Sequence, residues 1–200
     1  MPVYELRVSD DLKSDKPVDF VAGVDKPAIE DNFIAFKACL NNSIFEFSDV
    51  SEDFTTVFGA VMIPNQLILR KDENGNFFKV FYTAETIRTI ATKFFANGFQ
   101  NNFNLMHDHN QKMDGVTFFQ SVIKNKAKGI DGLKDDNPDG TWYLGANIAN
   151  EEVKKRIKSG EIKGFSIEGF FTKVPVNEPM YTPDEAHKMI AEILNRTQLN

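Results

Sequence analysis

The chain has few residues of the types that build disulfides, thiolate metal sites and nucleic-acid-binding faces. Cys39 is the only cysteine among 200 residues, which excludes an intrachain disulfide framework and a multi-cysteine metal site. We expect it to be a small buried hydrophobe. Lys and Arg number 23 against 29 Asp and Glu, and they are spread along the chain. A broad nucleic-acid-binding face is therefore disfavoured, because such a face needs a dense cationic patch.

Long apolar segments are also missing. The longest, Val57–Ile63, has seven residues, whereas a membrane-spanning helix needs roughly 20. The first 13 residues contain acidic side chains and no apolar segment of signal-peptide length. We therefore expect a soluble, cytoplasmic protein without a membrane partner.

Phenylalanine, by contrast, is abundant. The chain has 19 Phe against four Tyr and one Trp, so we expect a core built on phenylalanine. Its length fits one domain with a small appendage. We place the domain at residues 1–174 and a C-terminal loop and helix at residues 175–200, because Thr182-Pro183-Asp184-Glu185 is a capping box with proline at the first helical position. That helix is a candidate partner-binding extension.

Strand patterns outnumber helical ones. Apolar residues recur at helical spacing between Thr83 and Gly98, and Asn150 begins a second, charged helix that ends at Gly160. Strand patterns mostly follow one another directly and cover residues 3–8, 18–24, 32–37, 44–47, 55–63, 67–70, 77–82, 103–107, 116–123, 141–148 and 164–174. The sequence therefore predicts an α+β fold, a mainly antiparallel, barrel-like sheet flanked by two or three helices.

Two histidines at the end of a predicted strand are the first candidate for chemistry. If the strand continues, its period of two puts His107 and His109 on one face, as a pair of metal ligands would be. His187 is the only other histidine and Cys39 the only thiol, so carboxylates would have to complete a metal site. The alternatives are a catalytic role for one histidine and a solvated turn.

A serine between two apolar residues is the second candidate. Ser166 lies in Gly164-Phe165-Ser166-Ile167-Glu168-Gly169, on the strand face opposite Phe165 and Ile167, with glycines at both ends that allow close backbone approach. The segment is not the strand-to-helix elbow of α/β hydrolases, which needs glycine two residues before and two after the serine. Taken alone, such a serine is more often packed or solvated than reactive.

An acidic turn is the third candidate. Asp135, Asn137, Asp139 and Gly140 match the opening of a calcium-binding loop, but position twelve is Ala146 where a bidentate Glu is required. A turn is the better interpretation, and we predict neither a metal nor another cofactor.

The histidine and serine candidates are best interpreted together with the segments around them. In chain order the sequence has His107-Asp108 at a strand end, Gly140-Thr141-Trp142-Tyr143-Leu144-Gly145, a charged helix ending in Lys158-Ser159-Gly160-Glu161, and the segment around Ser166. Together they resemble the prohead (head maturation) proteases of tailed bacteriophages, over roughly residues 57–171.

This resemblance implies the fold of herpesvirus assemblin, a small, mostly antiparallel barrel flanked by helices, with serine and histidine on neighbouring strands. It implies that Ser166 is the nucleophile and His107 its general base. A serine hydroxyl attacks a peptide carbonyl only when a neighbouring base takes its proton, so the chemistry needs such a pair.

The N-terminal part departs from the family pattern. Val24-Asp25-Lys26-Pro27-Ala28-Ile29 is similar to a Pro-Ala segment that many members carry after the serine strand, but here it precedes the histidine. One hypothesis is a circular permutation, which requires residues 18–24 to pair beside the strand of Ser166 or that of His107.

The third catalytic residue is less clearly indicated. In the family it is an acidic residue or, in the viral relatives, a second histidine. Asp19, just upstream of the Pro-Ala segment, is our first choice. Glu168 shares a strand face with Ser166 but is expected to be poorly placed to orient His107. His187 lies in the capped C-terminal helix, and we expect it to be a surface residue and not a catalytic one.

The resemblance implies a phage serine endopeptidase that cleaves scaffold and capsid-protein segments inside assembling proheads in the host cytoplasm. Its partners would be the scaffold and major capsid proteins, and further copies of the chain if it oligomerises. One alternative is a catalytically inactive capsid-assembly or scaffold-like protein of the same fold, with Ser166 and His107 as relics. A metal-dependent hydrolase using His107 and His109 is a weaker alternative.

Overall fold

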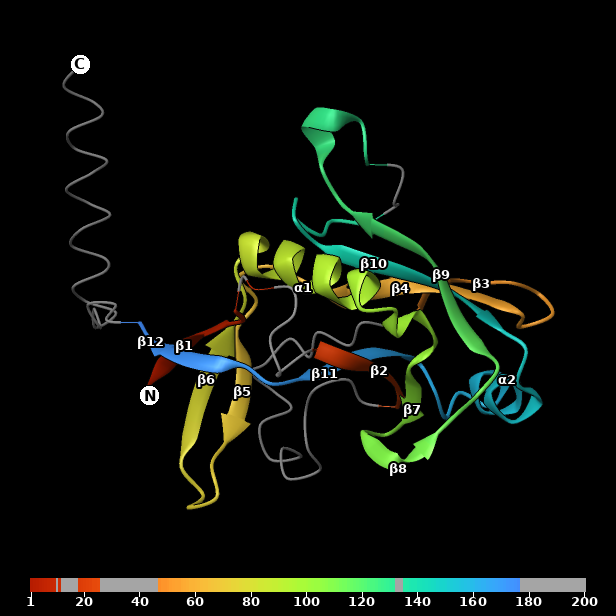
Figure 1. The fold of residues 1–200 in the computed structure, drawn as a ribbon, viewed down its shortest axis with the longest axis horizontal. Coiled ribbons are helices and arrows are strands. Elements are labelled where there is room, and N and C mark those ends of the chain that lie inside the picture. Colours follow the sequence, from red (N-terminus) through yellow and green to blue (C-terminus); the bar gives the residue numbers. More distant parts are fainter. Residues whose placement is uncertain (10, 12–17, 26–46, 132–134, 177–200) are drawn as a thin grey trace.

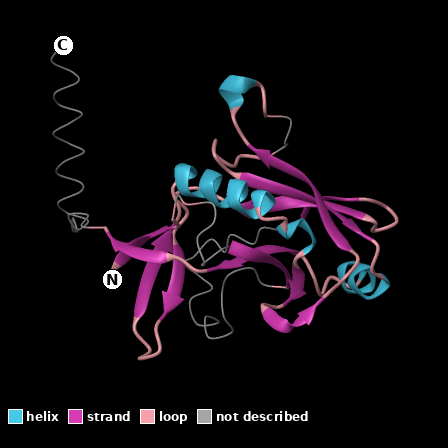
Figure 2. Cartoon of the chain, in the orientation of Figure 1, coloured by secondary structure: helices cyan, strands magenta, loops and turns pink. Residues whose placement is uncertain are grey.

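The computed structural model describes residues 1–9, 11, 18–25, 47–131 and 135–176. Within these ranges the chain forms two α-helices and three four-stranded sheets (Figure 1). The α+β class is confirmed, and strands clearly outnumber helices (Figure 2). The predicted barrel is wrong for this part of the chain, because none of the three sheets closes. The helix predicted after residue 175 and the strand predicted at 32–37 lie outside the described residues.

A break in one predicted strand separates the first sheet from the third. The run predicted over residues 164–174 is two strands, β11 (Gly164–Gly169) and β12 (Thr172–Pro175), separated by Phe170 and Phe171. β11 pairs with β2 (Val18–Val24), whereas β12 pairs with β1 (Val3–Arg7). The chain therefore passes from one sheet to another at this break and does not continue a single ladder.

The first sheet has the order β12-β1-β6-β5. β5 (Ile68–Lys71) and β6 (Phe77–Phe81) form the predicted hairpin, and β1 adds to β6 in parallel. The Asp72 carboxylate accepts hydrogen bonds from the backbone N–H groups of Asn74 and Asn76 and so closes the turn. Gly75, with φ of +85°, takes the left-handed conformation that glycine adopts at no steric cost.

The second sheet is antiparallel throughout, in the order β3-β4-β10-β9. Its strands are β3 (Phe47–Val50), β4 (Thr56–Met62), β9 (Val116–Ile123) and β10 (Trp142–Ile148). The third sheet has the order β11-β2-β7-β8, with β7 (Phe103–Leu105) and β8 (Asp108–Lys112). Here β2 pairs with β11 in antiparallel and with β7 in parallel fashion. The pairing that the permutation hypothesis requires is thus present.

Both helices begin and end as their sequences predict. In α1 (Ala84–Ala96) the Thr83 hydroxyl accepts a hydrogen bond from the backbone N–H of Thr86. In α2 (Glu151–Lys158) the Asn150 side chain caps the first turn, acidic residues follow it, and basic residues occupy the last turn, as the helix dipole favours. The helix α1 packs against β2 and β10 (Figure 1). Two short 3-10 helices, Phe99–Asn101 and Lys126–Lys128, complete the described elements.

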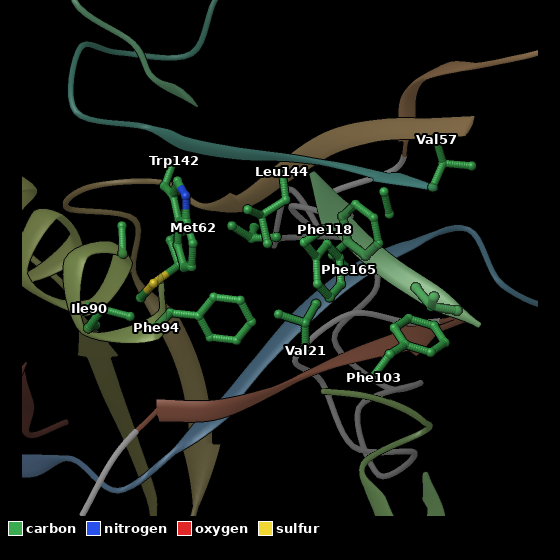
Figure 3. Close-up of a cluster of buried hydrophobic side chains, with 14 of the residues drawn as sticks. Val21, Val57, Met62, Ile90, Phe94, Phe103, Phe118, Trp142, Leu144 and Phe165 are labelled. Atoms are coloured by element: carbon green, nitrogen blue, oxygen red, sulfur yellow. The ribbon is translucent and has the colours of Figure 1, made fainter. Parts of the chain in front are cut away.

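An aromatic core lies between the second and third sheets (Figure 3). Phe118 of β9 makes an edge-to-face contact with Phe165 of β11, with ring centroids 5.5 Å apart, and Phe94 of α1 meets Trp142 of β10 in the same way at 5.9 Å. Such pairs stabilise beyond the burial of their area. The prediction of a phenylalanine core is therefore confirmed. No helix in the described ranges is long and apolar enough to cross a membrane.

Candidate active site

The third sheet presents two different faces. Its inner face, turned toward the aromatic core, carries Val21, Phe103 and Phe165, each at most 1% exposed (Figure 3). Because side chains alternate along a strand, the residues between them face the other way. Ser166, Ala22 and Asn104 are paired across β11, β2 and β7, so their side chains form one row. We call the side that carries this row and Glu168 the outer face.

The histidine lies in a tight turn that follows β7. Leu105 pairs with Asp108, and the two residues between them, Met106 and His107, have φ values of 51° and 61°. Two consecutive positive φ angles are those of a type I′ hairpin turn, and His tolerates this conformation better than most residues. The Met106 N–H donates to the carbonyl of Gly23 at 3.1 Å and so holds the turn against β2.

This turn corrects one expectation. The sequence predicts a strand through His107, which would put His107 and His109 on one face. The strand ends at Leu105, so His107 lies in the turn and His109 on β8, and the assumption of one continuous strand is wrong. The side chain of His109 is outside the described part of the structure. Nowhere among the described residues do three or more His, Cys, Asp or Glu side chains gather as a metal site would require.

The turn brings His107 to Glu168. His107 Nδ1 lies 3.1 Å from Glu168 Oε1, and the two side chains are 39% and 10% exposed. We expected Glu168 to be poorly placed to orient His107, because it points in parallel with Ser166, yet its Oε1 contacts His107 Nδ1. A carboxylate on Nδ1 leaves Nε2 for a substrate or a nucleophile and stabilises the ring when it is protonated.

Ser166 lies on the same strand face as Glu168. The two residues are regularly paired to Ala22 and Phe20 of β2, so their Cα atoms are separated by two residues of strand, about 6.8 Å. Ser166 is 5% exposed, and its hydroxyl forms no hydrogen bond within the described structure, to His107 or to any other group. Catalytic hydrogen bonds are often long or unformed until substrate binds.

The other predicted site residues have different positions. Asp19 is the extra residue of a bulge in β2, between the pairs Val18–Gly169 and Phe20–Glu168, and its carbonyl accepts a hydrogen bond from Asn102 Nδ2 at 2.9 Å. Asp19 as third catalytic residue stays a prediction. Both His187 and Cys39 are outside the described residues.

The carboxylates of the acidic turn accept hydrogen bonds from other groups of the protein. Asp135 accepts hydrogen bonds from the Tyr143 hydroxyl at 2.6 Å, from Lys124 Nζ at 2.9 Å and from the Asn137 N–H at 3.0 Å. Burial raises the pKa of Asp135, but these hydrogen bonds outweigh it and the net shift is downward. Asp139 accepts from the Lys126 N–H. The carboxylates therefore fasten the loop between β9 and β10.

Sequence reasoning missed one outer-face residue. Asn104 is 0% exposed, and in the described part of the chain neither its Oδ1 nor its Nδ2 has a hydrogen-bond partner. The available signal was its position between Phe103 and Leu105, because a polar residue between two buried ones must face the opposite side of a strand.

Comparison with known proteins identifies one family. The model of the family described as "Putative phage serine protease XkdF" matches residues 44–174, which include both His107 and Ser166. No curated protein and no solved structure matches the chain. The match confirms the resemblance to phage proteases that the sequence indicates.

Proposed function

Since the chain belongs to this family of phage serine proteases, we propose that it is a serine endopeptidase with Ser166 as nucleophile and His107 as general base. The observation that carries the assignment is the contact of His107 Nδ1 with Glu168, on the strand face that also carries Ser166. A histidine that contacts a carboxylate through one ring nitrogen and can take the proton of a serine with the other is an arrangement that many serine nucleophiles use.

In the proposed reaction each of these residues has one role. Ser166 Oγ bonds to the peptide carbonyl carbon while its proton passes to His107 Nε2. Glu168 stabilises the imidazolium that forms, because its carboxylate lies 3.1 Å from Nδ1. His107 then gives the proton to the leaving amine as the C–N bond breaks. Water repeats the sequence on the acyl-enzyme, releases the carboxylic acid and restores Ser166.

We further propose that the substrates are segments of scaffold and major capsid proteins, cleaved inside the assembling prohead in the host cytoplasm. The support for this is that the matched family is described as a phage serine protease and that the arrangement of motifs resembles that of prohead proteases. The Glu168 contact supports this carboxylate over Asp19 as the third catalytic residue.

Co-expression with the capsid and scaffold proteins of a phage that encodes a member of this family tests the proposal. We expect mass spectrometry to find shortened capsid or scaffold chains with the wild-type protein and full-length chains with Ser166→Ala. Heads that assemble with uncut chains in both cases would favour the inactive structural protein. Cleavage that survives Ser166→Ala but stops with a chelator would favour the metal-dependent hydrolase.

A further inference from the structure

Asn104 is a fully buried amide whose two polar atoms have no hydrogen-bond partner among the described residues. Leaving such a group unpaired destabilises a folded protein, and buried side-chain amides are normally satisfied. Two less buried asparagines, the exposed Asn97 and the half-buried Asn150, do have partners. Asn97 donates to the Lys93 carbonyl, and Asn150 donates to the carbonyl of Asp114. The Asn104 amide is therefore available, as far as the described residues go, to pair with another group.

Its position indicates which partner. Asn104 and Ser166 lie in one row of the outer face, on either side of Ala22. Two strand spacings separate them, about 9.6 Å between Cα atoms. Only the methyl group of Ala22 projects between them in this row, so a small group bound over Ala22 would contact both side chains. A peptide carbonyl attacked by Ser166 is such a group.

We propose that Asn104 supplies the oxyanion donor, its Nδ2 group hydrogen-bonding the carbonyl oxygen of the peptide that Ser166 attacks. When the Ser166 Oγ–carbon bond forms, the electron pair of the C=O π bond moves to the oxygen, and a donor about 3 Å from that oxygen stabilises the charge. The pair returns to the C=O bond when the amine leaves. The inference rests on the proposed function, because it needs a nucleophilic Ser166.

Burial favours this role. Ser166 is 5% exposed and Asn104 0% exposed, so both side chains are shielded from bulk water. A donor that is bonded to none of the described residues has no hydrogen bond to them to break before it meets the oxyanion, and its low-dielectric surroundings strengthen the contact. Asn104 lies on β7, the strand that leads into the turn of His107, so one short segment of backbone positions both the proposed donor and the proposed base.

The test is the second-order rate of labelling by a fluorophosphonate probe, whose phosphoryl oxygen takes the place of the oxyanion. We expect Asn104→Ala to label about 10²- to 10³-fold more slowly than wild type. Its melting temperature should not fall, because the substitution removes an unsatisfied buried amide. Asn104→Leu, which keeps the volume without the donor, should show the same slow labelling. Asn150→Ala is the matched control, with a lower melting temperature and an unchanged labelling rate.

The outcomes separate the two claims. If wild type is labelled at Ser166 and both Asn104 variants are labelled within about threefold of its rate, the inference is overturned and the proposed function stands. If labelling and melting temperature fall together in both variants, Asn104 is a structural residue and the inference is again overturned. If folded wild type is not labelled at all, the proposed function fails, and the inference with it.

Discussion

Phe165 and Ser166 are neighbours on β11, yet they belong to opposite faces of the third sheet. Phe165 is 1% exposed and packs edge-to-face on Phe118. Ser166 is almost as well buried, but its hydroxyl has no hydrogen-bond partner in the described structure, and the same is true of the Asn104 amide in its row. The inner face thus buries apolar side chains that hold the fold together, whereas the outer face buries polar groups that no described residue satisfies.

The largest effect on stability is expected at the inner face. Phe165→Ala should lower the free energy of unfolding by about 3–5 kcal/mol, because it removes a buried ring and leaves a cavity. Ser166→Ala, one residue away, should change it by no more than about 0.5 kcal/mol. Denaturant unfolding of the two variants measures both values. Equal losses would show that the faces do not differ as described.

The next largest effect is on reactivity and belongs to the outer face. Glu168→Gln should slow fluorophosphonate labelling about 100-fold or more, because the amide cannot stabilise the imidazolium of His107. Asp19→Asn is the matched comparison, and it should label at close to the wild-type rate if Glu168 is the third catalytic residue. The opposite ranking would return that role to Asp19.

A buried lysine outside the third sheet offers a further comparison, because its charge has partners. Lys124 is 1% exposed and fully partnered, with Asp135 Oδ1 at 2.9 Å and Asp131 Oδ1 at 3.5 Å. Lys124→Met should lower the free energy of unfolding by about 2 kcal/mol, because it leaves Asp135 without its cation and water offsets only part of that loss. Labelling of Ser166 in the folded variant should be unchanged. A variant as stable as wild type would show that this satisfied network contributes nothing.

The same network predicts a response to acid. Hydrogen bonds from Tyr143 and Lys124 hold the pKa of Asp135 below its usual value despite the opposing effect of burial. A carboxyl with a lowered folded-state pKa adds stability above its unfolded pKa of about 3.9, and that stability is lost as the pH falls through the folded value. Wild type should therefore lose more stability between pH 5 and pH 2.5 than Asp135→Asn does. Parallel unfolding curves for the two proteins at both pH values would contradict this.

The smallest expected effect is at the Asn150 cap. Its Oδ1 accepts hydrogen bonds from the N–H groups of Glu152 and Val153, and Asn150→Ala should cost about 1 kcal/mol of stability. The contrast with Asn104→Ala, where no loss is expected, compares a satisfied amide with an unsatisfied one. A loss at Asn104 larger than that at Asn150 would show that the Asn104 amide stabilises the fold.

Local patterns predicted the two faces but not the way in which distant segments meet. Alternation along residues 164–169 was enough to put Phe165 and Ser166 on opposite sides of a strand. The turn at Met106 and His107 escaped prediction because it has neither glycine nor asparagine, the residues that usually mark two positive φ angles. The contact of His107 with Glu168 depends on that turn, so it could not be foreseen. The switch of sheets after Gly169 depends on pairing with β1, which no local pattern encodes.

The most direct test of the central claim is the site of the covalent adduct. The folded wild-type chain, treated with a fluorophosphonate probe and digested, should carry the adduct on Ser166, and the adduct should disappear in His107→Ala under the same conditions. An adduct on another serine, or equal labelling of Ser166 in His107→Ala, would contradict the account.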